Sequence, residues 1–232
     1  TFNLDLMYAL PGQSAAQLQA DLDTALAFAP PHLSIYHLTI EPNTAFALAP
    51  PRLPDDDVAS EMLDAIVART AAAGLARYEV SAFARPGQRC VHNLNYWQFG
   101  DYLGIGAGAH GKLTLPDGIL RLAKYRQPQT YLARASGGDA AADQRWLSAD
   151  ERAFEFLLNA LRLCAGFTWT QFRERTGLPL TTIRPRLELA AQRGLVTLDG
   201  AGARATDRGF DLLDSVLEEV LPATTGTRGR DR

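Results

Sequence analysis

The chain has 232 residues, 47% of them hydrophobic, which is enough for one large domain or two smaller ones. Its formal net charge of -3 is unevenly placed, because residues 1–115 carry 6 Lys/Arg against 11 Asp/Glu and residues 116–232 carry 17 against 15. Neither half has the basic excess that would indicate nucleic-acid binding from charge alone.

The two cysteines, Cys90 and Cys164, lie far apart and predict neither a disulfide framework nor a metal site with three or four thiolate ligands. No apolar run approaches the ~18 residues of a membrane helix, and no secretory signal is present. These features predict a cytoplasmic protein. Because the chain opens on an apolar run without an initiator Met, we expect a C-terminal fragment whose upstream strands are missing.

The first part of the chain alternates predicted strands and helices. Ser14 is the expected N-cap of the first helix, and the acidic run at residues 55–57 opens the second, which ends at Gly74. The β-α-β-α-β order predicts parallel strands with helical crossovers, although three strands are too few to close a barrel. The predicted strands are residues 3–10, 32–40 and 78–83.

Residues 86–111 break this alternation and are expected to form a loop. The loop contains the sequence HNLNYW at residues 92–97 and then a glycine-rich run. Residues 112–122 predict a β-hairpin, which completes a first domain at residues 1–123. The polar, Gly/Ala-rich residues 124–145 are expected to be a linker with one short helix.

From residue 146 the pattern changes to three helices, a small β-wing and a last helix, which is typical of a winged-helix domain at residues 146–221. We expect residues 222–232, which are small, polar and basic, to be disordered. The predicted helices are residues 151–164, 170–176, 181–193 and 210–221, and the wing strands are residues 195–198 and 203–206.

The strongest chemical signal is HNLNYW, which places a histidine, two amides and two large aromatic residues within six positions. Aromatic rings stack on a flat macrocycle and an imidazole binds iron, so the combination suits a tetrapyrrole ligand. The residues alone leave a second interpretation open, in which His92 and Asn93 cap a turn while Tyr96 and Trp97 pack in the core.

Other candidate residues allow two interpretations each. The glycine run does not fit a dinucleotide-binding loop, because it leads into a hairpin; close approach to a planar ligand or a tight bend accounts for it. Asp5 is expected to be buried in the first strand, where it either faces a ligand or makes a structural hydrogen bond. Glu41 and Glu79, near strand ends, could be general acids or bases, or solvated edge residues.

The winged helix could bind DNA through its third helix, which carries Arg184, Arg186 and Arg193. Glu188 shares this helix, and the surrounding segments are acidic as well. The charges therefore favour an accessory domain that packs on the barrel.

Four stretches together identify a family resemblance: NLDLMYALPGQSAAQL, SIYHLTIEPNTAF, LPDDDVASEML and HNLNYWQFGDYLGIGAGAHG. In this order, and over nearly the whole chain, they resemble the oxygen-independent coproporphyrinogen III oxidase family of radical-SAM proteins. The resemblance implies an α/β fold, the C-terminal part of an incomplete (βα) barrel, followed by a small winged-helix-like domain.

Within that family, the HNxxYW motif, here His92, Asn93, Tyr96 and Trp97, is typical of heme chaperones of the HemW type and is not shared by the true oxidases. The resemblance implies that the protein binds heme through these four residues and transfers it to an unidentified acceptor protein. The alternatives are oxidative decarboxylation of coproporphyrinogen III, or binding of nucleic acid or protein through the winged helix; we expect no nucleic acid.

The resemblance also implies a cofactor pocket. Asp5 matches a strand aspartate that contacts S-adenosylmethionine, and His37 and His110 match positions near the same pocket. The family's CxxxCxxC motif is absent from the sequence, and the resemblance places it upstream of Thr1. We therefore expect S-adenosylmethionine and a [4Fe–4S] cluster only in the full-length protein, and no metal ligands in this chain.

Overall fold

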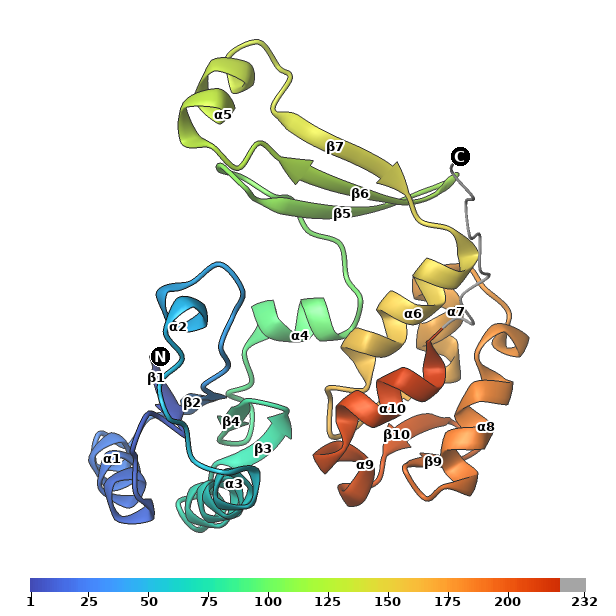
Figure 1. Cartoon of the computed structure of the whole chain (residues 1–232). Coiled ribbons are helices and arrows are strands. Elements are labelled where there is room, and N and C mark those ends of the chain that lie inside the picture. The colour runs from blue at the N-terminus through green and yellow to red at the C-terminus, as the bar shows by residue number, and fades with distance from the viewer. Residues whose placement is uncertain (222–232) are drawn as a thin grey trace, which may run out of the picture. The chain divides into compact units, whose positions relative to one another are not determined.

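The computed structural model describes residues 1–221, which divide into two compact units at the Val91–His92 bond (Figure 1). The division falls well before residue 123, where the sequence suggested the end of the first domain. The last residues, 222–232, for which disorder is expected, lie outside the described part of the chain. No helix within residues 1–221 is both long and apolar enough to cross a membrane.

A four-stranded sheet in the order β1-β2-β4-β3 forms the centre of the first unit. β1 and β2 are parallel, as predicted, with Asp5 opposite Ser34, and a helix connects them. β4 is antiparallel to both of its neighbours. The strands are β1 (Asn3–Tyr8), β2 (His32–His37), β3 (Ala76–Glu79) and β4 (Ala82–Ala84).

The prediction of a third parallel strand at residues 78–83 is therefore wrong, because the chain reverses within it. Val80 and Ser81 form the turn between β3 and β4. The Arg77 guanidinium donates to the Val80 carbonyl at 2.6 Å, and the Ser81 amide donates to the Glu79 carboxylate at 3.1 Å. The Ser81 carbonyl then accepts from the Ile35 amide at 2.8 Å, which joins the turn to β2.

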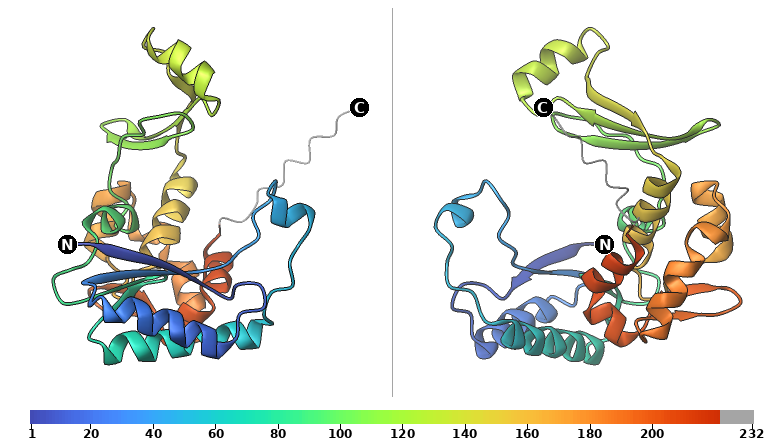
Figure 2. Two further views of the ribbon diagram at one scale, coloured as in Figure 1. Left: turned by 90° about the vertical axis from the view of Figure 1, so that its left-hand side faces the viewer. Right: turned by 45° about the vertical axis from the view of Figure 1, so that its right-hand side comes forward.

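Two helices cover one face of this sheet (Figure 2). α1 begins with the expected Ser14 cap, here a full capping box with Gln17, and α3 begins after Asp55 with acidic residues in its first turn. Their apolar stripes bury Leu22 and Ile66 against the sheet. The helices of this unit are α1 (Ala15–Ala27), α2 (Ala45–Leu48) and α3 (Asp56–Ala72).

The second unit begins with a helix and a three-stranded antiparallel sheet in the order β5-β6-β7. The predicted hairpin is present as β5 and β6, and the predicted short helix as α5. The elements are α4 (Val91–Trp97), β5 (His110–Leu115), β6 (Gly118–Lys124), α5 (Pro128–Ala135) and β7 (Ala141–Trp146).

β7 lies mostly within residues 124–145, for which the sequence predicts a linker. It pairs with β6 along the edge of the sheet, yet most of its side chains, from Ala142 to Trp146, are exposed. This strand is stabilised by backbone hydrogen bonds to β6 and buries few side chains. Its composition is therefore as polar as that of a linker, and the sequence does not predict a strand there.

The remaining residues form the predicted winged helix. Phe156 lies at the centre of its core, with ring centroids of Phe99, Phe167 and Phe172 at 5.8, 5.0 and 5.2 Å. The predicted last helix is broken at Leu212. The elements are α6 (Ala149–Ala160), β8 (Phe167–Thr168), α7 (Trp169–Thr176), the 3-10 helix Leu180–Thr182, α8 (Arg184–Gln192), β9 (Val196–Leu198), β10 (Gly202–Ala205), α9 (Asp207–Asp211) and α10 (Leu213–Val220).

A test of this packing uses Gly209 in α9, where an added Cβ would lie 1.8 Å from the carbonyl oxygen of Leu195. Because backbone cannot move aside as a flexible side chain can, we expect Gly209→Ala to lower the free energy of unfolding by about 3 kcal/mol. Urea denaturation measures this loss. The control is Gly200→Ala, whose Cβ would meet no atom within 4 Å and whose effect should be small. Equal unfolding midpoints for the two variants would contradict the packing.

Candidate functional site

The HNLNYW motif forms the helix α4 and is not the loop that the sequence suggested. The helix ends in a Schellman motif: the Phe99 amide donates to the Tyr96 carbonyl at 2.9 Å and the Gly100 amide to the Asn95 carbonyl at 2.7 Å. Phe99 takes the left-handed conformation, with φ 55°, at the position where glycine is usual. Glycine follows one residue later, so the usual stop signal is displaced and the helix is hard to recognise.

The side chain of Asn95 closes this helix end. Its Nδ2 donates to the Asp101 carbonyl at 3.0 Å. A Cβ on Gly100 would lie 2.0 Å from Asn95 Oδ1, so the close approach requires glycine at that position. Asn95 therefore stabilises the end of the helix, and the polar motif side chains that remain available to bind a ligand are His92 and Asn93.

The rings of His92, Tyr96 and Tyr102 form a ring line, each packed edge-to-face on the next, that leads from α4 into the rest of the unit. His92 and Tyr96 lie one helical turn apart on the same face, with ring centroids 4.8 Å apart at 86°. The ring of Tyr96 in turn lies 4.5 Å from that of Tyr102, at 67°. His92 is exposed, whereas Asn93 and Tyr96 are half-buried, so the imidazole is accessible at the open end of the line.

Trp97 is held separately from this line. It is half-buried, and the Arg162 guanidinium carbon lies 4.3 Å from the centroid of its ring. The indole Nε1 is buried and has no hydrogen-bond partner among residues 1–221. Trp97 is thus packed by a cation on one face and keeps an unused donor.

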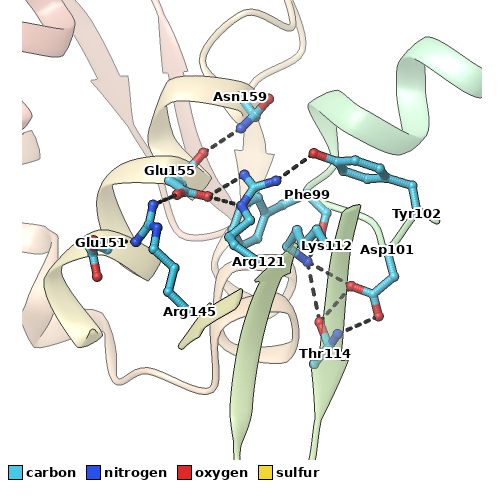
Figure 3. Close-up of polar contacts among 10 residues, drawn as sticks. All are labelled: Phe99, Asp101, Tyr102, Lys112, Thr114, Arg121, Arg145, Glu151, Glu155 and Asn159. Atoms are coloured by element: carbon cyan, nitrogen blue, oxygen red, sulfur yellow. Dashed lines mark hydrogen bonds and ion pairs between the residues drawn. The ribbon is translucent and has the colours of Figure 1, made fainter. Parts of the chain in front are cut away.

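Tyr102 is fixed by a buried cation on β5. Tyr102 and Lys112 exchange two backbone hydrogen bonds of 3.0 Å, and only 1% of the Lys112 side chain is exposed. Its Nζ donates to Asp101 Oδ1 at 2.8 Å, to the Phe99 carbonyl at 3.0 Å and to Thr114 Oγ1 at 3.3 Å (Figure 3). Nζ also lies 4.1 Å from the Phe99 ring centroid. The chain leaving α4 is therefore tied to the sheet.

Burial affects the two partners of this ion pair differently. Burial lowers the pKa of Lys112, and the attraction of Asp101 does not fully offset it. For Asp101, burial opposes ionisation, but hydrogen bonds from Lys112 and Thr114 outweigh it and lower the pKa. The carboxylate is 41% exposed and keeps part of its hydration, whereas the ammonium has lost nearly all of its own. Of the two residues, Lys112 therefore depends more on the ion pair, because its charge has almost no contact with water.

The ring line ends on an ion-pair network between β6, β7 and α6 (Figure 3). Arg121 Nη1 donates to the Tyr102 hydroxyl at 2.5 Å, and its Nε donates to Glu155 at 2.9 Å. Arg145 lies 3.6 Å from the same glutamate and 2.6 Å from Glu151. Burial alone would lower the pKa of Arg121, but the hydrogen bond and charge of Glu155 raise it.

A cavity of about 330 Å³ opens beside this network. Two guanidinium groups and two carboxylates face it, so its lining does not select an anion over a cation. His110, expected near a cofactor pocket, is an exposed member of the lining at the start of β5. The lining residues are Tyr102, His110, Arg121, Leu122, Ala123, Asp143, Arg145 and Glu155.

In the first unit, the expectation that Asp5 is buried is wrong. Asp5 is exposed on the sheet face away from α1 and α3, and its Oδ1 accepts from Asn3 Nδ2 at 2.6 Å. It is exposed because β1 alternates between two different faces, although its sequence reads as a continuous apolar run. His37 is also exposed but stacks on Tyr8 at 5.0 Å, on the opposite face from Asp5.

The two glutamates considered as acids or bases lie apart from these groups. Glu41 is exposed and accepts from Thr39 Oγ1 at 3.2 Å. Glu79 is buried, contrary to the solvated alternative, and one oxygen stabilises the turn between β3 and β4. His32 and Lys112 are both buried, and neither belongs to a motif, so sequence reasoning does not single them out.

Within residues 1–221, no three His, Cys, Asp or Glu side chains gather in a way that could hold a metal ion. Cys90 belongs to the first unit and Cys164 to the second, and neither forms a disulfide. Two thiols are too few for a cluster held by three cysteines.

Comparisons with known proteins agree with this architecture. Residues 147–212 match the HemN C-terminal domain family. The fold is similar to that of the solved radical-SAM enzyme coproporphyrinogen III oxidase (HemN) from Escherichia coli, with a TM-score of 0.71 over 94% of this chain and 54% of that one. The identity to it is 19%, so this likeness concerns the fold alone. It confirms the expected fold class, the C-terminal part of a radical-SAM α/β fold.

Sequence relatives narrow the class further. The chain is 46% identical to the heme chaperone HemW of Escherichia coli K12, over 95% of this chain and 58% of the relative. It is 36% identical to HemW of Mycobacterium tuberculosis H37Rv and 32% to HemW of Bacillus subtilis 168, each over 94% of this chain and over 55% and 58% of the relative. The chain thus spans little more than half the length of these relatives. Over nearly all of its own length it is similar in sequence to these proteins, each of which is named heme chaperone HemW.

The asymmetry of the buried ion pair gives a prediction. Asp101→Ala leaves the Lys112 ammonium buried without a counter-charge, so we expect the free energy of unfolding to fall by about 3 kcal/mol. Lys112→Met, which fills the site with an apolar chain, should cost less than Asp101→Ala, and the double variant should be more stable than Asp101→Ala alone. Urea denaturation of the three variants checks the order. Simple addition of the two losses would show that the pair is not coupled in this way.

Proposed function

We propose that this chain is part of a heme chaperone, which binds heme as cargo and passes it to an acceptor protein. The observation that carries the proposal is the exposed imidazole of His92 at the open end of the ring line on α4. An accessible imidazole beside aromatic rings suits a flat iron macrocycle, because the nitrogen can bind iron while the rings contact the macrocycle. The names of the relatives, heme chaperone HemW, support the same function.

The other motif residues have supporting parts in this proposal. Tyr96 is held between His92 and Tyr102, so it offers a fixed ring surface beside the imidazole. Trp97, packed under Arg162, contributes an indole N–H that has no acceptor within residues 1–221. Asn93, half-buried in the first turn of α4, supplies an amide next to the iron ligand. Ring positions fixed in advance reduce the entropy lost on binding.

The full-length protein would also bind S-adenosylmethionine and a [4Fe–4S] cluster, and it would act in the cytoplasm. We assign Asp5 to S-adenosylmethionine, because its carboxylate is exposed on the sheet face that no helix of its unit covers. His37, at the end of β2, and His110, at the start of β5, are proposed as further residues for binding this cofactor, each within its own unit. The bound cofactor would supply radical chemistry, or a regulatory signal, through parts of the protein beyond this chain.

The winged helix is proposed to be an accessory domain that does not bind nucleic acid. The arginines that could face DNA are engaged within their own domain. Arg184 donates to Glu188 at 3.0 Å, Arg186 to the Val220 carbonyl at 3.3 Å, and Arg193 pairs with Glu219. A phosphate backbone would have to compete with these partners.

The test is a heme titration of the full-length protein followed by the Soret band. We expect His92→Ala to weaken heme binding by about tenfold or more, because it removes the iron ligand but leaves the rings in place. Gln129→Ala is the control, since it removes an exposed polar side chain of α5 that lies outside the motif and outside the residues assigned to the cofactor. An unchanged affinity and an unchanged Soret spectrum for His92→Ala would exclude this histidine from the mechanism.

The same protein decides between chaperone and oxidase. In an anaerobic assay with S-adenosylmethionine, the proposed chaperone should decarboxylate coproporphyrinogen III no faster than background. Product formation well above background would instead favour the oxidase.

A further inference from the structure

The sheet face of the first unit that α1 and α3 leave uncovered carries a line of hydrogen-bonded polar groups that ends on Asp5. Asn3 Nδ2 lies 2.6 Å from Asp5 Oδ1, and Asn3 Oδ1 lies 2.7 Å from His32 Nδ1. On the far side of the imidazole, Nε2 lies 2.8 Å from the Tyr78 hydroxyl oxygen. That oxygen also accepts from the Cys90 amide at 3.3 Å. The line thus joins β1, β2, β3 and the segment before α4.

The chemistry of the groups gives every bond in the line a direction. An ionised carboxylate only accepts, so the Asn3 amide must present its NH2 group to Asp5 and its oxygen to His32. His32 Nδ1 therefore carries the proton and donates it to Asn3. Its Nε2 accepts from the Tyr78 hydroxyl in the neutral tautomer. The register supports this arrangement, since Asn3 lies opposite His32 and Asp5 opposite Ser34 on parallel strands.

Burial favours the uncharged forms that this direction requires. Burial lowers the pKa of His32, although the charge of Asp5 opposes the shift. Burial is also the main cause that raises the pKa of Tyr78 to about 12; the backbone hydrogen bond from Cys90 and the charge of Arg89 oppose the rise, while the charges of Glu79 and Cys90 add to it. At pH 7, therefore, the imidazole is neutral and the phenol keeps its proton.

We propose that His32 is a positioning residue for the ligand of Asp5. By holding the Asn3 amide in one orientation, it fixes Oδ1 of Asp5 and leaves the second carboxylate oxygen directed at a ligand that offers hydroxyl donors, such as a ribose. His32 does not itself touch the ligand. This inference rests on the proposed function to the extent that S-adenosylmethionine is the ligand of Asp5.

Removing the imidazole should release this orientation. Without a donor at Nδ1, the Asn3 carboxamide oxygen loses its partner on β2, so the Asn3 side chain can swing toward water and no longer hold Asp5 Oδ1 in place. Asp5 would then turn away to find a donor in water. Ser34 contacts both ends of the Asn3 amide, with Oγ 3.1 Å from Nδ2 and 3.3 Å from Oδ1, so it does not favour one orientation over the other.

The experiment measures binding of S-adenosylmethionine to the full-length, cluster-loaded protein by anaerobic equilibrium dialysis. Three variants separate a donor from a space-filling role: His32→Asn keeps a nitrogen donor near the Nδ1 position, His32→Gln keeps one near Nε2, and His32→Ala keeps neither. We expect His32→Asn to bind within about threefold of the unchanged protein, and the other two to bind about tenfold more weakly. Tyr78→Phe, which removes the hydroxyl that sets the tautomer, should weaken binding in the same direction and still fold.

Controls separate positioning from stability. Thr70→Val removes a buried hydroxyl that donates to the Ile66 carbonyl at 2.8 Å within α3, so it should lower the melting temperature without changing the affinity. Asp5→Ala should weaken binding, and His32→Ala should cause no further loss when Asp5 is already alanine.

Each remaining outcome overturns the proposal. Full affinity in Asp5→Ala would remove the assigned ligand of Asp5, and with it the basis of the inference. A loss in Asp5→Ala with full affinity in His32→Ala and Tyr78→Phe would reject His32 alone and leave the assignment of Asp5 standing. Equal weakening by His32→Asn and His32→Ala would show that the imidazole only fills space.

Discussion

The second unit depends on the buried ammonium group of Lys112. A cation without water must be satisfied by nearby acceptors, and those available are the Phe99 carbonyl, the Asp101 carboxylate and the Thr114 hydroxyl. Meeting this requirement brings the chain that leaves α4 alongside β5. Phe99 then enters the core of the winged helix, while Tyr102 is set against the ring line of α4. One electrostatic requirement thus links the motif helix, the sheet and the winged helix.

This framework explains how an exposed residue can still be well positioned. His92 itself is accessible, but the ring behind it, Tyr96, contacts Tyr102, whose hydroxyl is held by Arg121. In the proposed chaperone, heme must be bound and then released, which an exposed ligand allows and an enclosed one would hinder. The rings and the guanidinium group behind the imidazole are therefore held rigidly, whereas the side of His92 that would bind heme stays open to solvent.

In the first unit, one face of the sheet provides the hydrophobic core, and the other face carries the polar groups proposed for binding. The apolar face packs on α1 and α3 and supplies the core, with Leu33 and Ile35 pointing toward the helices. The opposite face carries the polar line from Tyr78 to Asp5; its bonds at His32 join residues far apart in the sequence, whereas the Asn3–Asp5 bond lies within β1. A single-residue shift of β1 against β2 would exchange the two faces, so the register of these strands determines both properties.

The sequence by itself determined the elements that local signals specify. These include the capped start of α1 at Ser14, the β5–β6 hairpin, the winged helix, and the motif residues that carry the family resemblance. Tertiary structure decided the features that depend on distant partners. The reversal between β3 and β4 depends on the Ser81–Ile35 bond, and the end of α4 on burial of Phe99. The polar line through His32 exists only because parallel strands bring residues about 30 positions apart into register, a pairing that no local pattern encodes.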